Sequence, residues 1–209
     1  MAEPDWLTWT RELQAIAQTG LAFTRDPYDR QRYEALRAVA SRIMAARTGV
    51  PAETFDTLFA AERGYATPKV GVRGAVFDTQ GRLLLVREIV DENRWTLPGG
   101  WAEPNLTAAE NVVKEVREES GYEVRVRKLA AVWDRGRQGH PPGLFSVYRF
   151  FFICDLIGGD ARPSLETSEV GWFTEADLPA DLSVNRVLPH QIRRMFVHAR
   201  QPALPTEFD

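Results

Sequence analysis

One continuous stretch decides the fold of this chain: Gly99-Gly-Trp-Ala-Glu-Pro-Asn-Leu-Thr-Ala-Ala-Glu-Asn-Val-Val-Lys-Glu-Val-Arg-Glu-Glu-Ser-Gly121. Its second half carries the signals of a helix. Thr107 and Glu110 fit a capping box, in which each side chain binds the backbone N–H of the other residue. Gly121 fits the left-handed position that ends many helices. The valines between these signals share one face, which we expect to be buried.

Three glutamates of this helix point to chemistry. Glu115, Glu118 and Glu119 are spaced i, i+3 and i+4, so their carboxylates converge on one side, beside the apolar face. Like charges at this spacing repel, and a cation would compensate them. Hard oxygen ligands suit Mg²⁺ or Mn²⁺. The alternative is a solvated acidic surface. The pair Gly99–Gly100 favours the metal site, because it predicts a close approach of the backbone to another group.

The first 64 residues predict three short helices. Trp6, Trp9, Leu13 and Ile16 recur at helical spacing. A second apolar stripe ends near Gly49, and a third helix follows Pro51. A unit of this size is too small to be stable alone. We therefore expect it to pack on the rest of the chain or on a partner subunit, and we place a domain boundary between 1–64 and 65–209.

From residue 65 onward, strands alternate with helices. Apolar alternation predicts strands over 70–76, 82–86, 95–97, 122–132, 148–156 and 170–173, and a last helix over 188–199. The tail from Gln201 is expected to be loose. This mixed order contains few βαβ repeats, so it favours an α/β fold with a mixed sheet layered between helices.

The composition excludes several classes of protein. The chain has 209 residues and a formal net charge of −3, so it carries no basic field for nucleic acid. Its single cysteine, Cys154, excludes an internal disulfide and a Cys-rich zinc site, and it lies in an apolar run typical of a buried strand. The N-terminus lacks the pattern of a signal peptide, and no apolar run is long enough to span a membrane. We expect a cytoplasmic protein.

The deciding stretch resembles the signature of the Nudix hydrolases: Gly, five residues, Glu, seven residues, then Arg-Glu-aliphatic-x-Glu-Glu-x-Gly-aliphatic. Gly100 aligns with the first glycine, and the following positions match without a gap: Glu115, Val116, Glu118, Glu119 and Gly121. Three positions depart from the signature. Leu106 stands in place of its first glutamate, Lys114 in place of its arginine and Tyr122 in place of its last aliphatic residue.

The resemblance extends to the flanks. Segments 95–101, 147–152, 166–169 and 172–173 look like a Nudix subfamily with an extra N-terminal helical domain, which is associated with nucleoside diphosphate–X substrates such as ADP-ribose and CDP-choline. It implies a Nudix α/β/α sandwich that follows a small all-helical domain. It also implies hydrolysis of the diphosphate bond with Mg²⁺ (or Mn²⁺). The aromatic residues of the first helices suggest a homodimer.

Residue roles follow from this resemblance. Glu115, Glu118 and Glu119 would hold the metal ions, together with the Gly100 carbonyl, and the general base would be Glu119 or Glu166. Candidates for substrate binding are three arginines, one histidine in a Gly/Pro-rich loop and one aromatic stacking surface: Arg73, Arg87, Arg135, His140 and Trp101. Each of them also has a structural alternative, as a strand face, a loop residue or a core residue.

Other functions remain open at this point. A nucleotide-pool enzyme acting on modified nucleoside triphosphates is usually smaller than this chain. An isopentenyl-type isomerase would need a cysteine in its site, whereas Cys154 lies in the apolar strand. A ligand-sensing regulator with a degenerate Nudix domain tends to lose the glutamates that are intact here. The basic streak Arg32, Arg37, Arg42 and Arg47 is expected to be a solvated helix face rather than a surface that recognises DNA.

Overall fold

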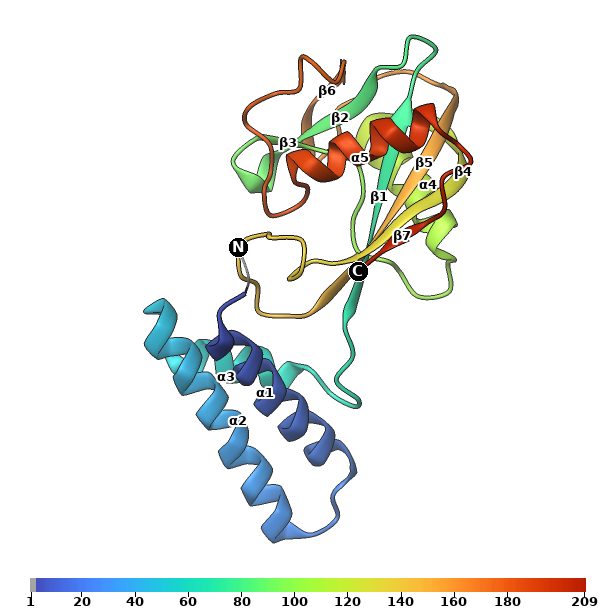
Figure 1. Ribbon diagram of the computed structural model, residues 1–209. Helices are drawn as coiled ribbons and strands as arrows, with labels where there is room; N and C mark the ends of the chain where they lie inside the picture. Colours follow the sequence, from blue (N-terminus) through green and yellow to red (C-terminus); the bar gives the residue numbers. More distant parts are fainter. Residues whose placement is uncertain (1–2) are drawn as a thin grey trace. The chain divides into compact units, whose positions relative to one another are not determined.

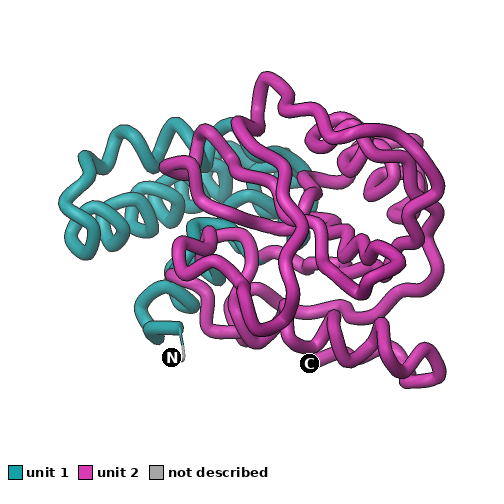
Figure 2. Tube along the Cα trace, turned by 90° about the horizontal axis from the view of Figure 1, so that it is seen from above, with its two compact units in different colours: residues 1–68, 142–146 teal, residues 69–141, 147–209 magenta. Residues whose placement is uncertain are grey.

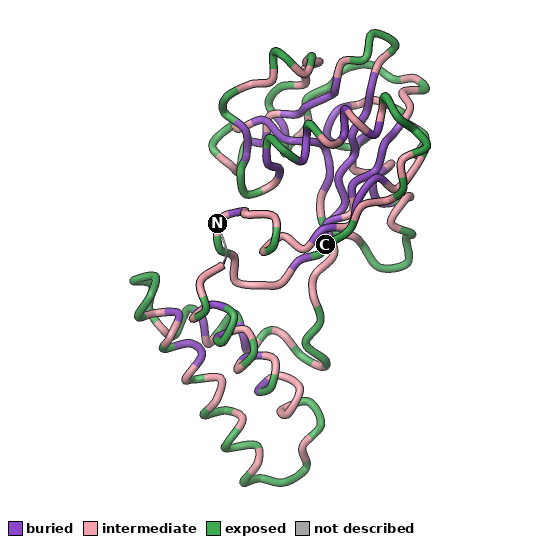
Figure 3. The backbone as a smooth tube through the Cα atoms, in the orientation of Figure 1, coloured by how far each residue is buried: buried purple, intermediate pink, exposed green. Residues whose placement is uncertain are grey.

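The computed structural model describes residues 3–209, which form two compact units (Figure 2). One unit contains residues up to Pro68 together with Pro142–Ser146, and the other contains Lys69–Pro141 and Val147–Asp209. The predicted domain boundary at residue 64 stays a prediction. Each unit has its own buried residues, and buried positions concentrate in the strands of the second unit (Figure 3).

The first unit is helical, as predicted. Its helices are α1 (Asp5–Phe23), α2 (Pro27–Thr48) and α3 (Ala52–Ala61). The Asp26 carboxylate caps α2 by accepting from two backbone N–H groups, and Gly49 ends this helix at φ 75°. The core of the unit contains five buried residues: Leu7, Ala40, Met44, Phe55 and Phe59.

The buried face of α1 differs from its most apolar stripe. The helix buries Leu7, Thr10, Gln14 and Ala17. Trp9 and Ile16 remain 60% and 47% exposed, although helical spacing places them on the apolar stripe. The reason is packing, because α2 and α3 cover the side of α1 on which Leu7 is the one large apolar residue among the four buried ones. An apolar face of α1 is therefore left outside the core of this unit.

The second unit is built on a mixed sheet. Its elements are β1 (Lys69–Phe77), β2 (Leu83–Glu88), a 3₁₀ turn η1 (Ile89–Asp91), β3 (Arg94–Thr96), α4 (Ala108–Ser120), β4 (Tyr122–Asp134), β5 (Val147–Gly159), β6 (Thr167–Phe173), α5 (Pro189–Arg200) and β7 (Glu207–Phe208). Within residues 3–209, the sheet has the order β3-β2-β1-β5-β4-β7, and β6 pairs with β2. The central pair β1–β5 is parallel, and β4–β5 is antiparallel.

Helices cover both faces of this sheet. On β5, Phe151 and Ile153 face the core that contains α5, whereas Phe152 and Cys154 face the core that contains α4. Figure 1 shows α5 in front of the strands and α4 behind them. A strand buried on both faces reads as a continuous apolar run, which explains the sequence of this strand. The predicted α/β/α sandwich with a preceding helical region is confirmed. The prediction that Cys154 is buried is also confirmed, and burial raises the pKa of its thiol to about 12.

The C-terminal tail is ordered, so the expectation of a loose tail was wrong. Strand β7 pairs in parallel with Ala131 and Val132 of β4. Glu207 forms an ion pair with Arg194 of α5, and its Oε1 lies 3.1 Å from Nε2 of the buried His198. Sequence patterns did not reveal this strand, because two residues are too short to show alternation. No helix within residues 3–209 has the length and apolar character needed to cross a membrane.

Replacing Phe151 by Ala tests the central core. Phe151 is fully buried and its ring centroid lies 5.0 Å from that of Trp133. The cavity left by the ring is expected to cost about 3–5 kcal/mol of unfolding free energy. Guanidinium unfolding measures this loss. The matched control is Ile157→Ala near the end of the same strand, where the residue is 61% exposed. A change beyond about 0.5 kcal/mol there would contradict the exposure of this position.

Candidate functional site

The helix that carries the three glutamates is capped as predicted. The Glu110 N–H donates to Thr107 Oγ1 at 3.2 Å, and the Thr107 N–H donates to Glu110 Oε2 at 2.8 Å. Gly121 adopts φ 77° at the C-terminal end. Val112 and Val116 are buried against the sheet. The caps and the apolar face together set which side of α4 presents its carboxylates.

The glycine pair brings a loop against both β1 and α4. The Gly74 N–H donates to Pro98 O, and the Val72 N–H donates to Gly100 O, each at 2.9 Å. A Cβ at Gly99, which has φ 144°, would lie 2.1 Å from Val72 O, and one at Gly100 would lie 2.5 Å from Glu115 Oε1. A side chain at Gly99 is therefore excluded by the backbone of β1, whereas one at Gly100 would have to displace the Glu115 carboxylate. The predicted close approach of the backbone is confirmed.

One cavity of about 670 Å³ collects the predicted acidic residues. Glu115, Glu118 and Glu119 line it from α4, and Glu166 lines it from the loop before β6. Gly100 and Trp101 line it from the glycine loop. Other residues of the lining were not predicted: Glu88, Glu103, Lys114 and Arg186. Six of the predicted site residues are thus brought together.

Glu119 is the most buried of these carboxylates. It is 7% exposed and accepts the Gly99 N–H at 2.9 Å. Burial raises the pKa of Glu119 to about 8, although the charge of Arg73 and the Gly99 hydrogen bond act in the opposite direction. The Arg73 guanidinium is itself buried and donates to Leu97 O at 3.1 Å and to Gly99 O. Arg73 thus holds the glycine loop in place, and its positive charge favours the ionised form of the Glu119 carboxyl.

Glu115 and Glu118 have different surroundings. Burial raises the pKa of Glu115, and within residues 3–209 no group donates a hydrogen bond to its carboxylate. Glu118 pairs with Lys114 at 2.8 Å, and the same Nζ contacts Glu103 at 3.0 Å. Lys114 stands where the Nudix signature has arginine. It joins the two carboxylates as a point charge, without the fork of a guanidinium.

The chemistry of these donors fits a hard divalent cation. Across residues 3–209, no three acidic, histidine or cysteine side chains are already gathered as a metal cluster. The lysine holds Glu118 to one side, and the charge of Glu115 contributes to raising the pKa of Glu119, so each carboxylate disfavours the ionised form of the other. A cation would relieve that repulsion, and carboxylate oxygens are the ligands that Mg²⁺ and Mn²⁺ prefer. The Gly100 carbonyl already accepts from Val72, but its oxygen has a second lone pair.

The loop that carries Glu166 is attached to the end of α4. Thr167 Oγ1 donates to Glu119 O at 2.6 Å, and the Ile89 N–H donates to Glu166 O at 2.9 Å. The neighbouring Leu165 is 99% exposed. These bonds hold the backbone of the loop at the cavity while its side chains remain accessible.

The structure does not place the other predicted residues in the lining of this cavity. Arg87 pairs with Asp181 at 2.8 Å and Glu169 at 3.3 Å, and its guanidinium lies 5.5 Å from the Trp95 ring centroid. His140 is 4% exposed, and its Nδ1 lies 2.7 Å from Val184 O. Arg73 serves the glycine loop, as described above. The roles of these residues and of Arg135 in substrate binding stay predictions.

The unpredicted residues left different signals in the sequence. Glu88 ends a strand that otherwise reads as apolar, and Glu103 lies within the deciding stretch itself. Either could have been noticed as a charge close to the glutamate helix. Arg186 lies in an irregular segment ahead of α5, far along the chain from the glutamate helix α4, and no local sequence pattern marks it. Only the folding of that segment against β2 brings it to the cavity.

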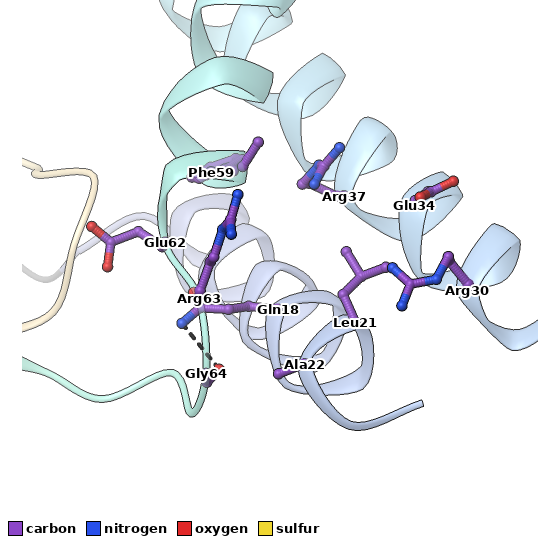
Figure 4. A pocket seen from close by; sticks show the side chains of 11 residues that line it. Gln18, Leu21, Ala22, Arg30, Glu34, Arg37, Phe59, Glu62, Arg63 and Gly64 are labelled. Carbon is purple, nitrogen blue, oxygen red and sulfur yellow. Dashed lines mark hydrogen bonds between the residues drawn. The ribbon is translucent and has the colours of Figure 1, made fainter. Parts of the chain in front are cut away.

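A second cavity, of about 430 Å³, lies in the helical unit (Figure 4). Arg30, Arg37 and Arg63 line it together with Glu34, Glu62 and the apolar side chains of Leu21 and Phe59. Gln18 Nε2 donates to Gly64 O at 3.3 Å beside it, and Arg37 pairs with Asp56. Its two carboxylates come from different segments and do not converge as those of α4 do. The acidic cavity in the sheet unit is therefore the better candidate for catalysis.

Comparison with known families agrees with this geometry. The NUDIX domain matches residues 67–194, and a domain described as the UDP-X-like, N-terminal oligomerisation domain matches residues 4–59. The chain therefore belongs to the Nudix family. It is a Nudix pyrophosphohydrolase, as the sequence predicts. Nudix hydrolases generally use a divalent metal ion, in agreement with the donors of the acidic cavity.

Three relatives give the scale of the likeness. A protein of Bacillus subtilis (strain 168), provisionally named the ADP-ribose pyrophosphatase YjhB, is 43% identical over 99% of this chain and 98% of its own length. The crystal structure of a UDP-X diphosphatase is 31% identical, with full coverage of both chains and a TM-score of 0.62. An ADP-ribose pyrophosphatase from Streptococcus suis 89-1591 is 34% identical over 68% of this chain and all of its own, with a TM-score of 0.61.

The buried His140 predicts a loss of stability in acid. Burial, with the Arg149 charge, lowers the pKa of His140 from 6.5 to about 4, so the folded state resists protonation. Its contribution is complete above pH ~6.5 and is lost as the pH falls toward 4. We expect roughly 2 kcal/mol to disappear by pH ~4.5.

The measurement is the unfolding free energy of the wild type and of His140→Gln at steps between pH 7.5 and pH 4.5. Gln carries no charge, so the gap between the two proteins should narrow as the pH falls. A gap that is constant over this range would show that His140 is not held neutral by its surroundings.

Proposed function

We propose that this protein hydrolyses the diphosphate bond of a nucleoside diphosphate linked to a second moiety, with ADP-ribose and CDP-choline as representative substrates. The observation that carries the proposal is the convergence of Glu115, Glu118, Glu119 and Glu166 on one cavity. The names of the full-length relatives, an ADP-ribose pyrophosphatase and a UDP-X diphosphatase, support the same class of substrate.

The three glutamates of α4 and the Gly100 carbonyl are the proposed ligands of Mg²⁺ or Mn²⁺. When bound, the metal neutralises diphosphate charge and lowers the pKa of a coordinated water. Glu119 reaches the cavity floor with one oxygen held by the Gly99 N–H, which leaves the other oxygen for the metal. The Gly99 hydrogen bond thus orients a ligand, and it depends on the absence of a side chain at that position.

Two carboxylates can accept the proton of the attacking water. Glu119 is buried beside the proposed metal site, and Glu166 reaches the same cavity from an exposed loop. In a single carboxylate, coordination of a metal ion and acceptance of a proton compete for the same oxygen atoms. Glu166 has no such conflict, because it lines the cavity without being one of the proposed metal ligands. We therefore propose Glu166 as the general base and Glu119 as a metal ligand.

Trp101 is the proposed surface for the nucleoside. Its side chain lines the cavity and is 57% exposed, an unusual state for a large aromatic residue. Its backbone is held rigidly, since Trp101 pairs with Gly71 of β1. An exposed indole on a fixed backbone can stack on a base and cover it from water.

The helical unit is proposed to join two copies of the chain. Trp9, Ile16 and Phe23 are 60%, 47% and 56% exposed and recur every seven residues along α1. This spacing forms a continuous apolar stripe of the kind that packs helices together. The match of residues 4–59 to an N-terminal oligomerisation domain supports this interpretation.

Substrate hydrolysis and the Glu119→Gln variant test the proposed function. The wild type is incubated with ADP-ribose, CDP-choline and a UDP-sugar in Mg²⁺, and the phosphate-ester products are quantified. For the best substrate, Glu119→Gln should lower kcat/KM by at least ~10²-fold, since it removes a charged ligand next to the reacting groups. Glu123→Gln, on the exposed side of β4, is the matched control. Undiminished turnover by Glu119→Gln would contradict the proposed metal site.

Sedimentation equilibrium tests the proposed dimer. The wild type should sediment with twice the mass of the chain, and Ile16→Asp should shift it toward the monomer because a charge would be buried in the stripe. Ile157→Asp, at an exposed position of the sheet unit, should leave the mass unchanged. A monomeric wild type would reject this interface.

A further inference from the structure

We propose that Arg186 is the guanidinium that binds the diphosphate of the substrate, and that Glu88 is its partner only until the diphosphate arrives. This inference rests on the proposed function, because it assigns a residue to the same cavity. Arg186 lines the same cavity as the glutamates of α4, and its side chain is 30% exposed. It pairs with Glu88, with Nη2 closest to Oε1.

Arg186 is the cation best placed for this task. Among the described residues that line the cavity, Lys114 is the other cation, and its Nζ already joins Glu103 and Glu118. The donors of Arg73 go to the carbonyls of the glycine loop, and those of Arg87 go to carboxylates outside the cavity. A guanidinium has five N–H donors, so one carboxylate partner leaves donors for phosphate oxygens.

A buried clamp holds the backbone from which Arg186 projects. His140 Nδ1 lies 2.7 Å from Val184 O, and Arg149 Nη2 donates to Asn185 O at 2.7 Å. Arg149 also donates to the carbonyl of Arg186 itself through Nη1. Three successive carbonyls are therefore held by two side chains that are 4% and 8% exposed.

This clamp is costly, which suggests that the position of the segment matters. Burial lowers the pKa of Arg149, and the nearby charges of Arg73, Arg135 and Arg186 lower it further. The carbonyls of the 184–186 segment supply the compensating hydrogen bonds. A buried charge held this way is less favourable than an apolar residue in the same place. The clamp fixes the backbone from which the Arg186 side chain starts, next to a cavity in which a phosphate must be positioned accurately.

Glu88 explains how the guanidinium is stabilised without substrate. Glu88 is 8% exposed, and Asp91 and Glu166 add negative charge nearby. A diphosphate that takes over the donors of Arg186 competes with the Glu88 carboxylate. The two residues of the pair thus act on an incoming anion with opposite signs, Arg186 attracting it and Glu88 repelling it. A purely structural ion pair would instead respond in the same direction to the loss of either partner.

The test compares Arg186→Gln with Glu88→Gln, both in the full chain with Mg²⁺. Calorimetry measures the Kd of inorganic pyrophosphate, and kinetics measures KM and kcat for the substrate that the wild type cleaves best. Arg186→Gln should raise the pyrophosphate Kd and the substrate KM at least ~10-fold, the loss expected for a charged hydrogen bond. Glu88→Gln should lower the pyrophosphate Kd by about twofold or more, since a repelling charge is removed.

Two further variants complete the experiment. Arg186→Lys keeps the charge and the fold but lacks the planar fork, so it should recover part of the affinity. Arg125→Gln, an exposed arginine that pairs with Asp155 at 3.4 Å, is the control for general charge effects and should match the wild type. Thermal unfolding monitors the fold of each variant, and Arg186→Lys carries the test if Arg186→Gln does not fold.

The outcomes separate this inference from the proposed function. Opposite shifts for the two glutamine variants support it. Equal losses for both variants, an unchanged Kd for Arg186→Gln, or failure of the wild type to bind pyrophosphate would each overturn it. A wild type that cleaves no substrate of the panel but binds pyrophosphate through Arg186 would reject the proposed function and leave the anion site in place.

Discussion

The approach of the glycine loop to β1 is the contact on which the rest of the site depends. Backbone hydrogen bonds hold Pro98 and Gly100 beside β1, and the Gly99 N–H binds Glu119. The loop therefore joins the sheet to the acidic face of α4 through one short segment without side chains at its centre. Arg73 binds the same loop from inside the sheet. A bulkier loop would separate the helix from the strand, and the carboxylates would lose their shared cavity.

Electrostatics in that cavity is a balance between burial and neutralisation. The packing of α4 that stabilises the domain also buries Glu119, which raises the pKa of this carboxyl to about 8. The chain supplies few cations against this acidic surface, and Lys114 already bridges two of its carboxylates. The metal ion proposed above would resolve the conflict and would make an acidic site able to accept a polyanionic substrate. The formal net charge of −3 is for that reason a poor guide to the ligand.

The two units of the chain carry different kinds of surface. The sheet unit buries apolar side chains on both faces of β5 and concentrates charge in one cavity. The helical unit has a small core and leaves Trp9, Ile16 and Phe23 of α1 in contact with water. Exposed apolar area of this extent on a small helical unit favours association. The proposed chemistry and the proposed assembly therefore fall on separate parts of the sequence, each with its own pattern.

The sequence by itself determined the main elements and the helix that carries the three glutamates. The caps at Thr107 and Gly121, the alternation along β5 and the spacing of the glutamates are local patterns, so they could be interpreted without the fold. They were sufficient to recognise the Nudix signature and to predict the α/β/α sandwich. The apolar stripe of α1 was also visible, but its exposure was not, because burial depends on which neighbours a helix finds.

Only the tertiary structure decided which charges meet. His140, whose role in substrate binding stays a prediction, is buried against the backbone of Val184, and Arg186 lines the cavity without any local signal in the sequence. The β7 strand was likewise invisible, since it pairs with β4 across a long separation in the chain. Local periodicity indicates the secondary structure of a segment, but the tertiary fold determines which side chains from distant segments come into contact. For that reason the glutamates that line this cavity could be predicted from the sequence, whereas the presence of Arg186 beside them could not.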